Sequence, residues 1–450
     1  MAGYSPHTEA EVTTMLGFLG LSSLEDLFDV IPEALRLAGG LDLPDGMTEP
    51  DAVAYMGDLA GMNRPAGRDL VCFAGGGAYD HEVPPVTRAL ASRSEFVTSY
   101  TPYQPEVAQG VLQAVFEFQT LIARLTGMEV ANASLYDGAA ATVEAVNLGV
   151  AASGRNVVWV SRGLNPTWRQ VLATFGAGTG HRLVDVPLED GVTRWNAVDA
   201  SGDDRPGVVV VAYPNYLGCL EDLATARRVC DETGAMLVVA FDPIAAGVLQ
   251  SPARWGADVV VGEGQALGMP LSFGGPYLGL FACGLAQVRR LPGRLVGETV
   301  DAEGRRAYVS TLRAREQDIR REKATSNVCT NQTLMAVTAA IQMGWLGTSG
   351  IAEVALRSAR ATHYCRTKLL GVPGVEPLVA APVLREFAVR LPLPAPTVIE
   401  RLIDEGFLAG IALDSGYTSG ADDGLLVAVT ERRTRVEIDA FVDAVSKAVR

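Results

Sequence analysis

Five short apolar segments, separated by helical or loop stretches, constrain the fold of this chain more than any other feature. They lie at residues 156–160, 208–213, 236–241, 258–261 and 277–281. The valines at 208–211 leave no polar face, and a strand that is apolar on both faces needs helices on both sides of its sheet. Strands that alternate with helices indicate an α/β fold with a mainly parallel sheet.

Around these segments the sequence predicts three regions. Residues 1–70 form an N-terminal helical segment, residues 71–345 a large α/β domain, and residues 346–450 a small C-terminal α+β domain. Apolar residues recur with helical spacing over 105–126, which predicts a long helix that ends at Gly127. A helix at 330–345 leads into the small domain, which has predicted helices at 351–369, 397–405 and 435–449 and strands at 386–391 and 425–429.

The charge balance excludes partners that need a basic surface. The chain has 37 Lys and Arg against 52 Asp and Glu, a net charge of −15, whereas nucleic acids and anionic membranes both require a basic face. No run of about 18 apolar residues predicts a membrane span, and the first residues lack the pattern of a secretory signal. Because the six cysteines are scattered without a CxxC pair, we expect reduced thiols and a cytoplasmic protein.

The common ligand motifs are missing from the sequence. The glycines at 75–77 and 178–180 do not give GxGxxG after a strand, so turns are favoured and a Rossmann dehydrogenase is a distant alternative. Neither GxSxG nor GxxxxGK[ST] occurs, which leaves hydrolase and P-loop functions without support. The four histidines lie far apart and form no HxxxH or HExxH, so we expect no metal site.

Two residues at predicted strand ends bear on cofactor chemistry. Asp242 follows the 236–241 strand, where it could pair with the pyridinium nitrogen of pyridoxal phosphate (PLP), although its position alone favours a cap on the following turn. Gln265 follows the next strand, where a fold-type I PLP enzyme carries its Schiff-base lysine. An amide is not a nucleophile toward an aldehyde, so no Schiff base can form at Gln265.

No other residue replaces that lysine. The chain has three lysines, of which Lys323 lies in a charged stretch that predicts a solvated helical face, while Lys368 and Lys447 lie in the small domain. Asp137 is expected to cap the helix that follows it, and its carboxylate would repel a cofactor phosphate there. Both features count against cofactor binding within this chain.

The segment 98–105 is dense in hydroxyl and aromatic side chains. Two prolines hold it extended or turned just before the long helix. Such a loop lines a small polar pocket or simply joins the helix to the sheet, and the sequence leaves both interpretations open.

Several long motifs converge on one family. They are GGAYDH at 76–81, SYTPYQPE at 99–106, NASLYDGA at 132–139, VGEGQ at 261–265 and REKATSNVCTNQ at 321–332. Over essentially its whole length the chain resembles the α subunits of bacterial two-chain glycine dehydrogenases (decarboxylating), the P-proteins of the glycine cleavage system. One departure is Asn165, where we expect a histidine before the proline.

The resemblance implies a fold-type I PLP-dependent transferase architecture and a heteromeric enzyme. A homologous β subunit carries the lysine and binds PLP, commonly in an α2β2 assembly, while the α chain holds no PLP covalently. The complex decarboxylates glycine with PLP as the electron sink, releases CO2 and passes the aminomethyl group to the lipoyl arm of the H-protein.

We therefore expect polar and aromatic residues of this chain to shape the partner's pocket. The candidates are Tyr100, Tyr103 and Gln104 in the first loop, and Ser134, Tyr136 and Asp137 in the turn before a helix. Thr325 and Asn327 are weaker candidates, as cross-interface contacts or as plain helix caps.

Three classes of function stay open at this point. The chain is a PLP-free subunit of a decarboxylating dehydrogenase, a self-sufficient PLP enzyme that uses an unexpected lysine, or a structural pseudoenzyme that only stabilises its partner. The position of Gln265 favours the first class over the second.

Overall fold

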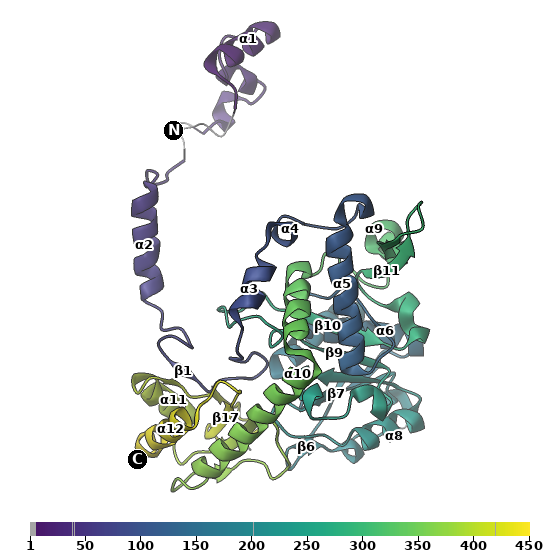
Figure 1. Ribbon diagram of the computed structural model, residues 1–450, viewed down its shortest axis with the longest axis vertical. Helices are drawn as coiled ribbons and strands as arrows, with labels where there is room; N and C mark the ends of the chain where they lie inside the picture. The colour runs from purple at the N-terminus through teal and green to yellow at the C-terminus, as the bar shows by residue number, and fades with distance from the viewer. Residues whose placement is uncertain (1–5, 38, 40, 201, 419) are drawn as a thin grey trace. The chain divides into compact units, whose positions relative to one another are not determined.

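The computed structural model describes residues 6–37, 39, 41–200, 202–418 and 420–450. The chain divides into two compact units, Met1–Asn63 and Arg64–Arg450 (Figure 1). The predicted boundaries at 70 and 345 remain predictions about domain organisation.

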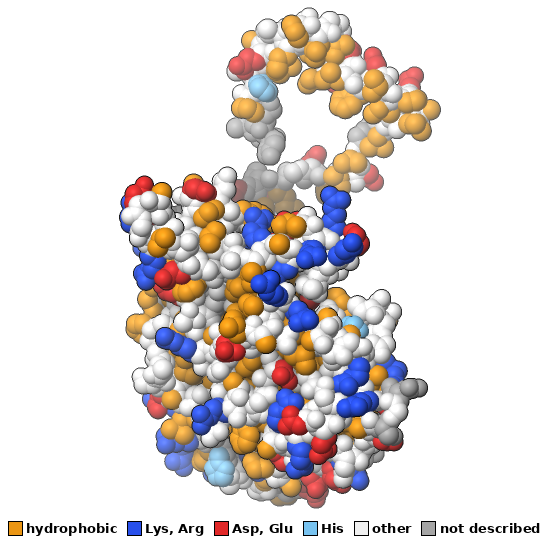
Figure 2. All heavy atoms as spheres, turned by 90° about the vertical axis from the view of Figure 1, so that its right-hand side faces the viewer, with side chains coloured by type: hydrophobic (Ala, Val, Ile, Leu, Met, Phe, Trp, Pro, Cys, Tyr) orange, Lys and Arg blue, Asp and Glu red, His pale blue; other side chains and the backbone are white. Residues whose placement is uncertain are grey.

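The N-terminal unit consists of two helices and short 3-10 turns. These are α1 (Glu9–Leu19), α2 (Glu49–Gly61) and the turns Glu25–Phe28 and Glu33–Leu35. Thr8 begins α1 with a capping box to Glu11, and Thr48 caps α2, because a side-chain oxygen satisfies the free N–H groups of a first turn. Neither helix buries a side chain, and apolar groups gather on the surface of this unit (Figure 2).

The second unit is built on a seven-stranded sheet. Its order is β2 (Val130–Ala131), β10 (Gly279–Cys283), β9 (Val259–Glu263), β8 (Met236–Phe241), β7 (Val208–Tyr213), β3 (Val157–Ser161) and β4 (Arg182–Val186). The strands from β9 to β4 pair in parallel, and β10 runs antiparallel to both its neighbours. The prediction of a mainly parallel α/β fold is confirmed.

Helices cover both faces of this sheet, as the apolar strands require. Val208 and Val210 pack into a core with α6 (Gly138–Ser153) and α7 (Pro166–Thr179), whereas Val209 and Val211 face α8 (Leu223–Thr233). The alternation follows from the two-residue period of a strand.

Two long helices cover the β10 end of the sheet (Figure 1). One is α5 (Pro105–Thr126), which has the predicted bounds and ends at Gly127 in the left-handed conformation. The other is α10 (Thr333–Leu369), which joins the two predicted helices across a break at Gly347. Among the described residues only α10 has the length and composition of a membrane span, but Ala336, Ala339 and Met343 pack in a protein core with α5.

The C-terminal residues form a second, antiparallel sheet. Its strands are β13 (Glu376–Pro377), β14 (Glu386–Arg390), β17 (Gly424–Ala428) and β16 (Ile411–Ala412), with α11 (Ala395–Asp404) and α12 (Arg435–Ala448) beside them. The core includes side chains from the end of α10. Beside this sheet, β1 (Val71–Cys72) pairs in parallel with β15 (Phe407–Leu408).

The remaining elements are short. They are α3 (Pro85–Ala91), α4 (Ser94–Val97), β5 (Leu188–Glu189), β6 (Val192–Thr193), β11 (Leu295–Val300), β12 (Arg306–Thr311) and α9 (Gln317–Arg320). The hairpin of β11 and β12 was not predicted; it packs on α5 through Val296 and Tyr308.

Candidate functional site

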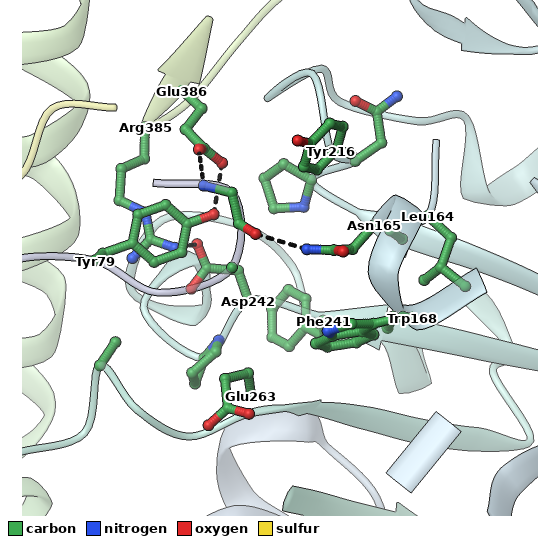
Figure 3. A pocket seen from close by; sticks show the side chains of 18 residues that line it. Tyr79, Leu164, Asn165, Trp168, Tyr216, Phe241, Asp242, Glu263, Arg385 and Glu386 are labelled. Atoms are coloured by element: carbon green, nitrogen blue, oxygen red, sulfur yellow. Dashed lines mark hydrogen bonds and ion pairs between the residues drawn. The ribbon is translucent and has the colours of Figure 1, made fainter. Parts of the chain in front are cut away.

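A small cavity lies where β7, β8 and β9 end, the edge at which open α/β sheets bind their ligands. Its volume is about 80 Å³. Side chains of the large sheet, of the loop before α3 and of the start of β14 converge on it (Figure 3). The lining includes Tyr79, Asn165, Trp168, Tyr216, Phe241, Asp242, Glu263, Arg385 and Glu386.

Asp242 is held by a turn and by a buried guanidinium. Its Oδ1 accepts a hydrogen bond from the N–H of Ile244 at 2.9 Å, so it caps the turn as its position favours. Its Oδ2 lies 2.6 Å from Nη2 of Arg385, a side chain that is 5% exposed. Burial, the largest single effect, would lower the pKa of Arg385, but Asp242, Tyr79 and Glu386 together outweigh burial and raise it. The carboxylate is therefore already neutralised within the chain.

Arg385 is fixed on every side. Its guanidinium carbon lies 3.5 Å from the ring centroid of Tyr79, a cation–π contact. Its Nη1 lies 2.5 Å from Nε2 of His81, whose Nδ1 lies 2.6 Å from Glu431. Because Arg385 belongs to the C-terminal sheet and Asp242 to the large sheet, the cluster ties these two parts together.

Glu386 holds the glycine-rich loop at 75–79. It accepts a hydrogen bond from the hydroxyl of Tyr79 at 2.5 Å and one from the N–H of Gly76 at 2.6 Å, while Asn165 donates to the carbonyl of Gly76 (Figure 3). Burial raises the pKa of Glu386 to about 7. At the position where a histidine was expected, Asn165 thus holds the glycine-rich loop by a hydrogen bond from its side-chain amide.

The N-terminus of α6 is filled by the chain's own carboxylates. Glu263 accepts hydrogen bonds from the N–H groups of Gly138, Gln265 and Leu278, each at 2.9 Å. Asp137 accepts from the N–H of Ala140 at 2.7 Å and is the N-cap, as predicted. A helix N-terminus favours an anion, and here the anion is a protein side chain. Burial raises the pKa of Glu263 to about 7.

A close approach explains why residue 138 is glycine. A Cβ there would lie 2.3 Å from the ring of Trp168 and 3.1 Å from the nitrogen of Glu263. Only a residue without a side chain lets α6 begin against both groups.

Gln265 is a satisfied core residue. Its side chain is 1% exposed, its Oε1 accepts from the N–H of Tyr79 at 2.9 Å, and its Nε2 donates to the carbonyls of Tyr79 and Met269 at 3.1 and 2.7 Å. These bonds use the acceptor and both donors of the amide.

The residues at this site do not fit PLP. The predicted Schiff-base position is an amide, and the acid that could face the pyridinium nitrogen is paired with Arg385. Glu263 takes the N–H of Gly138 at the start of α6, where a phosphate would be held. The cavity of about 80 Å³ is also far below the roughly 300–1,000 Å³ of ordinary ligand pockets.

The first predicted loop lies away from this cavity, between α4 and α5. Tyr100 is 82% exposed, while Tyr103 is 47% exposed and accepts a hydrogen bond from Nη2 of Arg294 at 2.7 Å. Gln104 is the N-cap residue of α5, without a side-chain bond to the helix. Tyr103 and Gln104 line a wide cavity of about 1070 Å³ at the start of α5.

The second predicted group meets the loop that precedes α10. Ser134 is buried with a φ of 116°, and its hydroxyl accepts from the amide of Asn331 at 3.0 Å. The hydroxyl of Tyr136 accepts from the N–H of Cys329 at 3.3 Å, and Arg294 donates to the Cys329 carbonyl at 2.9 Å. Arg294 therefore connects both predicted groups.

Thr325 and Asn327 lie exposed in the same loop. The interpretation of these two residues as helix caps is wrong, because α10 begins after Gln332, several residues downstream. Among the described residues, no group of three or more His, Cys, Asp and Glu side chains is placed to hold a metal ion.

Four residues that line the cavity at the ends of β7, β8 and β9 were not among the predicted site residues. Tyr79 and Glu263 lie within quoted motifs, and Arg385 and Glu386 stand at the start of a predicted strand. An Arg–Glu pair directly before an apolar strand was the only local signal, since their partners lie in distant segments.

Comparisons with known proteins find relatives over nearly the whole length of the chain. The family model "Glycine cleavage system P-protein" matches residues 2–445. The probable glycine dehydrogenase (decarboxylating) subunit 1 of Moorella thermoacetica is 47% identical over 442 residues, and that of Chloroherpeton thalassium 44% over 444, with at least 98% of each chain covered.

Solved structures agree with this similarity. A crystal structure of glycine decarboxylase (P-protein) of the glycine cleavage system, in inhibitor-bound form, is 45% identical, with a TM-score of 0.92 over 99% of this chain and 100% of that one. Glutamate decarboxylase of Lactobacillus brevis CGMCC 1306 is only 14% identical, with a TM-score of 0.67 over 94% and 97% of the two chains, and shares the fold alone.

Proposed function

Because the chain belongs to the glycine cleavage system P-protein family, as subunit 1 of a glycine dehydrogenase (decarboxylating), we propose that it acts as the subunit without cofactor. The enzyme depends on PLP and has a partner subunit. The buried Gln265 carries this proposal. It stands at the Schiff-base position, and its amide is bonded within the core.

The partner in this proposal is the homologous β subunit, which carries the lysine and binds PLP. The two chains form an α2β2 assembly in the cytoplasm that decarboxylates glycine, releases CO2 and transfers the aminomethyl group to the lipoyl arm of the H-protein. When bound to the partner, PLP supplies the electron sink for decarboxylation. In this proposal the present chain contributes residues that face the partner's active site, and it binds no cofactor itself.

The two predicted groups form that surface. Tyr100 and Tyr103 are exposed aromatic side chains beside a wide cavity, and aromatic residues of this kind are enriched at protein interfaces. The Ser134–Asp137 turn is joined to the same region through Cys329 and Arg294. A docked partner would thus meet both groups together.

One experiment tests where the cofactor binds. The chain is purified alone, incubated with PLP and reduced with borohydride, and the same is done with the co-expressed partner complex. We expect a phosphopyridoxyl-lysine in the partner only. A labelled lysine in the present chain would instead establish a self-sufficient PLP enzyme.

A second experiment tests the role of the surface. Tyr100→Phe and Tyr103→Phe are introduced into the complex, and glycine–bicarbonate exchange and the KM for H-protein are measured. We expect a loss of activity in at least one assay. Tyr364→Phe is the matched control, because it removes a hydroxyl that bonds Asp439 on α12. Unchanged kinetics in both loop variants would favour a purely structural subunit.

A further inference from the structure

Three arginine side chains among the described residues are less than one tenth exposed, and one of them makes no ion pair with a described carboxylate. Arg385 pairs with Asp242 at 2.6 Å, and Arg433 pairs with Asp80 at 3.1 Å. Arg294 is 6% exposed, and no carboxylate of the described residues lies within 4 Å of it. Its guanidinium donates only to the hydroxyl of Tyr103 and the carbonyl of Cys329.

A buried charge without a partner of opposite sign is costly, because it loses its hydration without full compensation. Neutral acceptors and the ring of Tyr103, whose centroid lies 4.6 Å from the guanidinium carbon of Arg294, offset only part of this cost. The environment of Arg294 is therefore suited to an incoming anion.

Two further arginines add positive charge beside Arg294. The guanidinium carbon of Arg313 lies 5.5 Å from the ring centroid of Tyr103, so this ring lies near two cations. Arg315 donates to the carbonyl of Gly293, next to Arg294, at 3.0 Å. Burial lowers the pKa of Arg315, and the charge of Glu316 offsets only part of this effect.

The carboxylates in this region do not neutralise the cluster. Glu316 and Asp318 form ion pairs with Arg313 at 3.9 and 3.6 Å, which are loose ion-pair distances rather than hydrogen bonds. The charge of Glu316 also acts on Arg294 and Arg315. Three guanidiniums thus face two carboxylates, and a positive charge remains.

We propose that Arg294, Arg313 and the hydroxyl of Tyr103 form a binding site for a small oxyanion, a carboxylate or a phosphate. Tyr103 lines the wide cavity at the start of α5, and the guanidiniums of Arg294 and Arg313 lie near its ring. The planar donors of arginine match the oxygens of both anions, and charge-assisted hydrogen bonds are the strong ones. Arg315 supports the site with its charge.

The inference goes beyond the proposed function and does not depend on it, since it concerns this chain without a partner. The full-length chain is titrated by calorimetry with inorganic phosphate, and separately with glycine as the carboxylate, at constant ionic strength set by chloride. We expect saturable binding of at least one of them. The probe that binds distinguishes a phosphate site from a carboxylate site, and no saturable binding of either would overturn the proposal.

Substitutions test whether anion binding depends on these residues. Arg313→Gln alters a side chain that is 39% exposed and so leaves the fold intact, and we expect the affinity to fall about tenfold or more. Arg294→Met should abolish binding, with circular dichroism as the check on folding. Arg305→Gln, on the exposed turn of the β11–β12 hairpin, is the matched control and should bind as the wild type does. Equal affinities for the control and Arg313→Gln would also refute the site.

Discussion

Arg385 and Asp242 form a buried ion pair at 2.6 Å that joins the start of β14 to the end of β8. The pair connects the antiparallel C-terminal sheet to the large parallel sheet across the cavity where a ligand of this fold would bind. The contact that holds the two parts together therefore also lines this cavity.

We predict that Asp242→Asn destabilises the chain strongly. The substitution leaves the buried guanidinium of Arg385 without a counter-charge, and breaking one side of a buried pair typically costs about 3–5 kcal/mol. Urea unfolding measures the loss, and the double variant with Arg385→Met should recover part of it, because both charges are then absent.

The exposed ion pair between Arg305 and Asp301 is the control for the Asp242 and Arg385 variants. Asp301→Asn should leave the urea midpoint nearly unchanged, since exposed ion pairs contribute little. If Asp242→Asn were as mild as this control, the interpretation of the pair as a structural tie would be wrong.

We predict that Gln265→Lys alone does not restore cofactor binding. The new lysine would lose the three hydrogen bonds of the amide, and Glu263 would still take the N–H of Gly138 at the start of α6. Borohydride reduction with PLP, followed by peptide mapping, should find no phosphopyridoxyl group at position 265. A stoichiometric label there would show that the lysine was the only missing part.

The contrast between Gln265 and Arg385 shows how far the sequence leads. Gln265 could be assigned from its place after a strand, because motif position is local information. The role of Arg385 depends on a loop and a strand end far away in sequence, and no local pattern specifies such a contact. The assignment of Tyr100 and Tyr103 to a subunit interface remains a prediction for the same reason, since it concerns a contact outside this chain.

For the fold, too, features set by local sequence could be predicted, whereas features set by distant segments could not. The helix 105–126 was predicted with its observed bounds, because helical periodicity and the stop at Gly127 are local. The direction of β10 was not, since antiparallel pairing with β9 depends on how the chain returns to the sheet. The two helices on either side of Gly347 were predicted, but their direct continuation into each other as α10 was not.

We predict that Asp137→Ala costs about 1 kcal/mol of stability. Its Oδ1 accepts the N–H of Ala140, and loss of an N-cap of this kind typically costs that amount. Asp137→Asn keeps an acceptor oxygen at the same position and should cost much less. Chemical denaturation of both variants checks the difference, and equal losses would mean that the negative charge matters more than the cap.

We predict that the chain loses stability as pH rises from about 5.5 to 7. Burial raises the pKa of Glu263 and of Glu386 to about 7 from the ordinary value of 4.5. The folded chain therefore holds protons that the unfolded chain releases, so this contribution is complete below about 4.5 and is lost as pH rises through 7. Each group contributes a slope of at most about 1.4 kcal/mol per pH unit.

The urea midpoint is measured at several pH values, and its change with pH is compared between variants to identify the residues responsible. Glu263→Gln removes one titrating group and should make the dependence shallower, whatever its effect on stability at a single pH. Glu431 acts in the opposite direction. Burial is the largest single effect on it, but its interactions with His81 and with backbone N–H groups together outweigh burial and lower its pKa to about 2, so it titrates below the measured range. Glu298→Gln, on the exposed part of β11, changes the net charge equally and should leave the slope unchanged. Identical slopes for the wild type and Glu263→Gln would contradict the assignment to the α6 terminus.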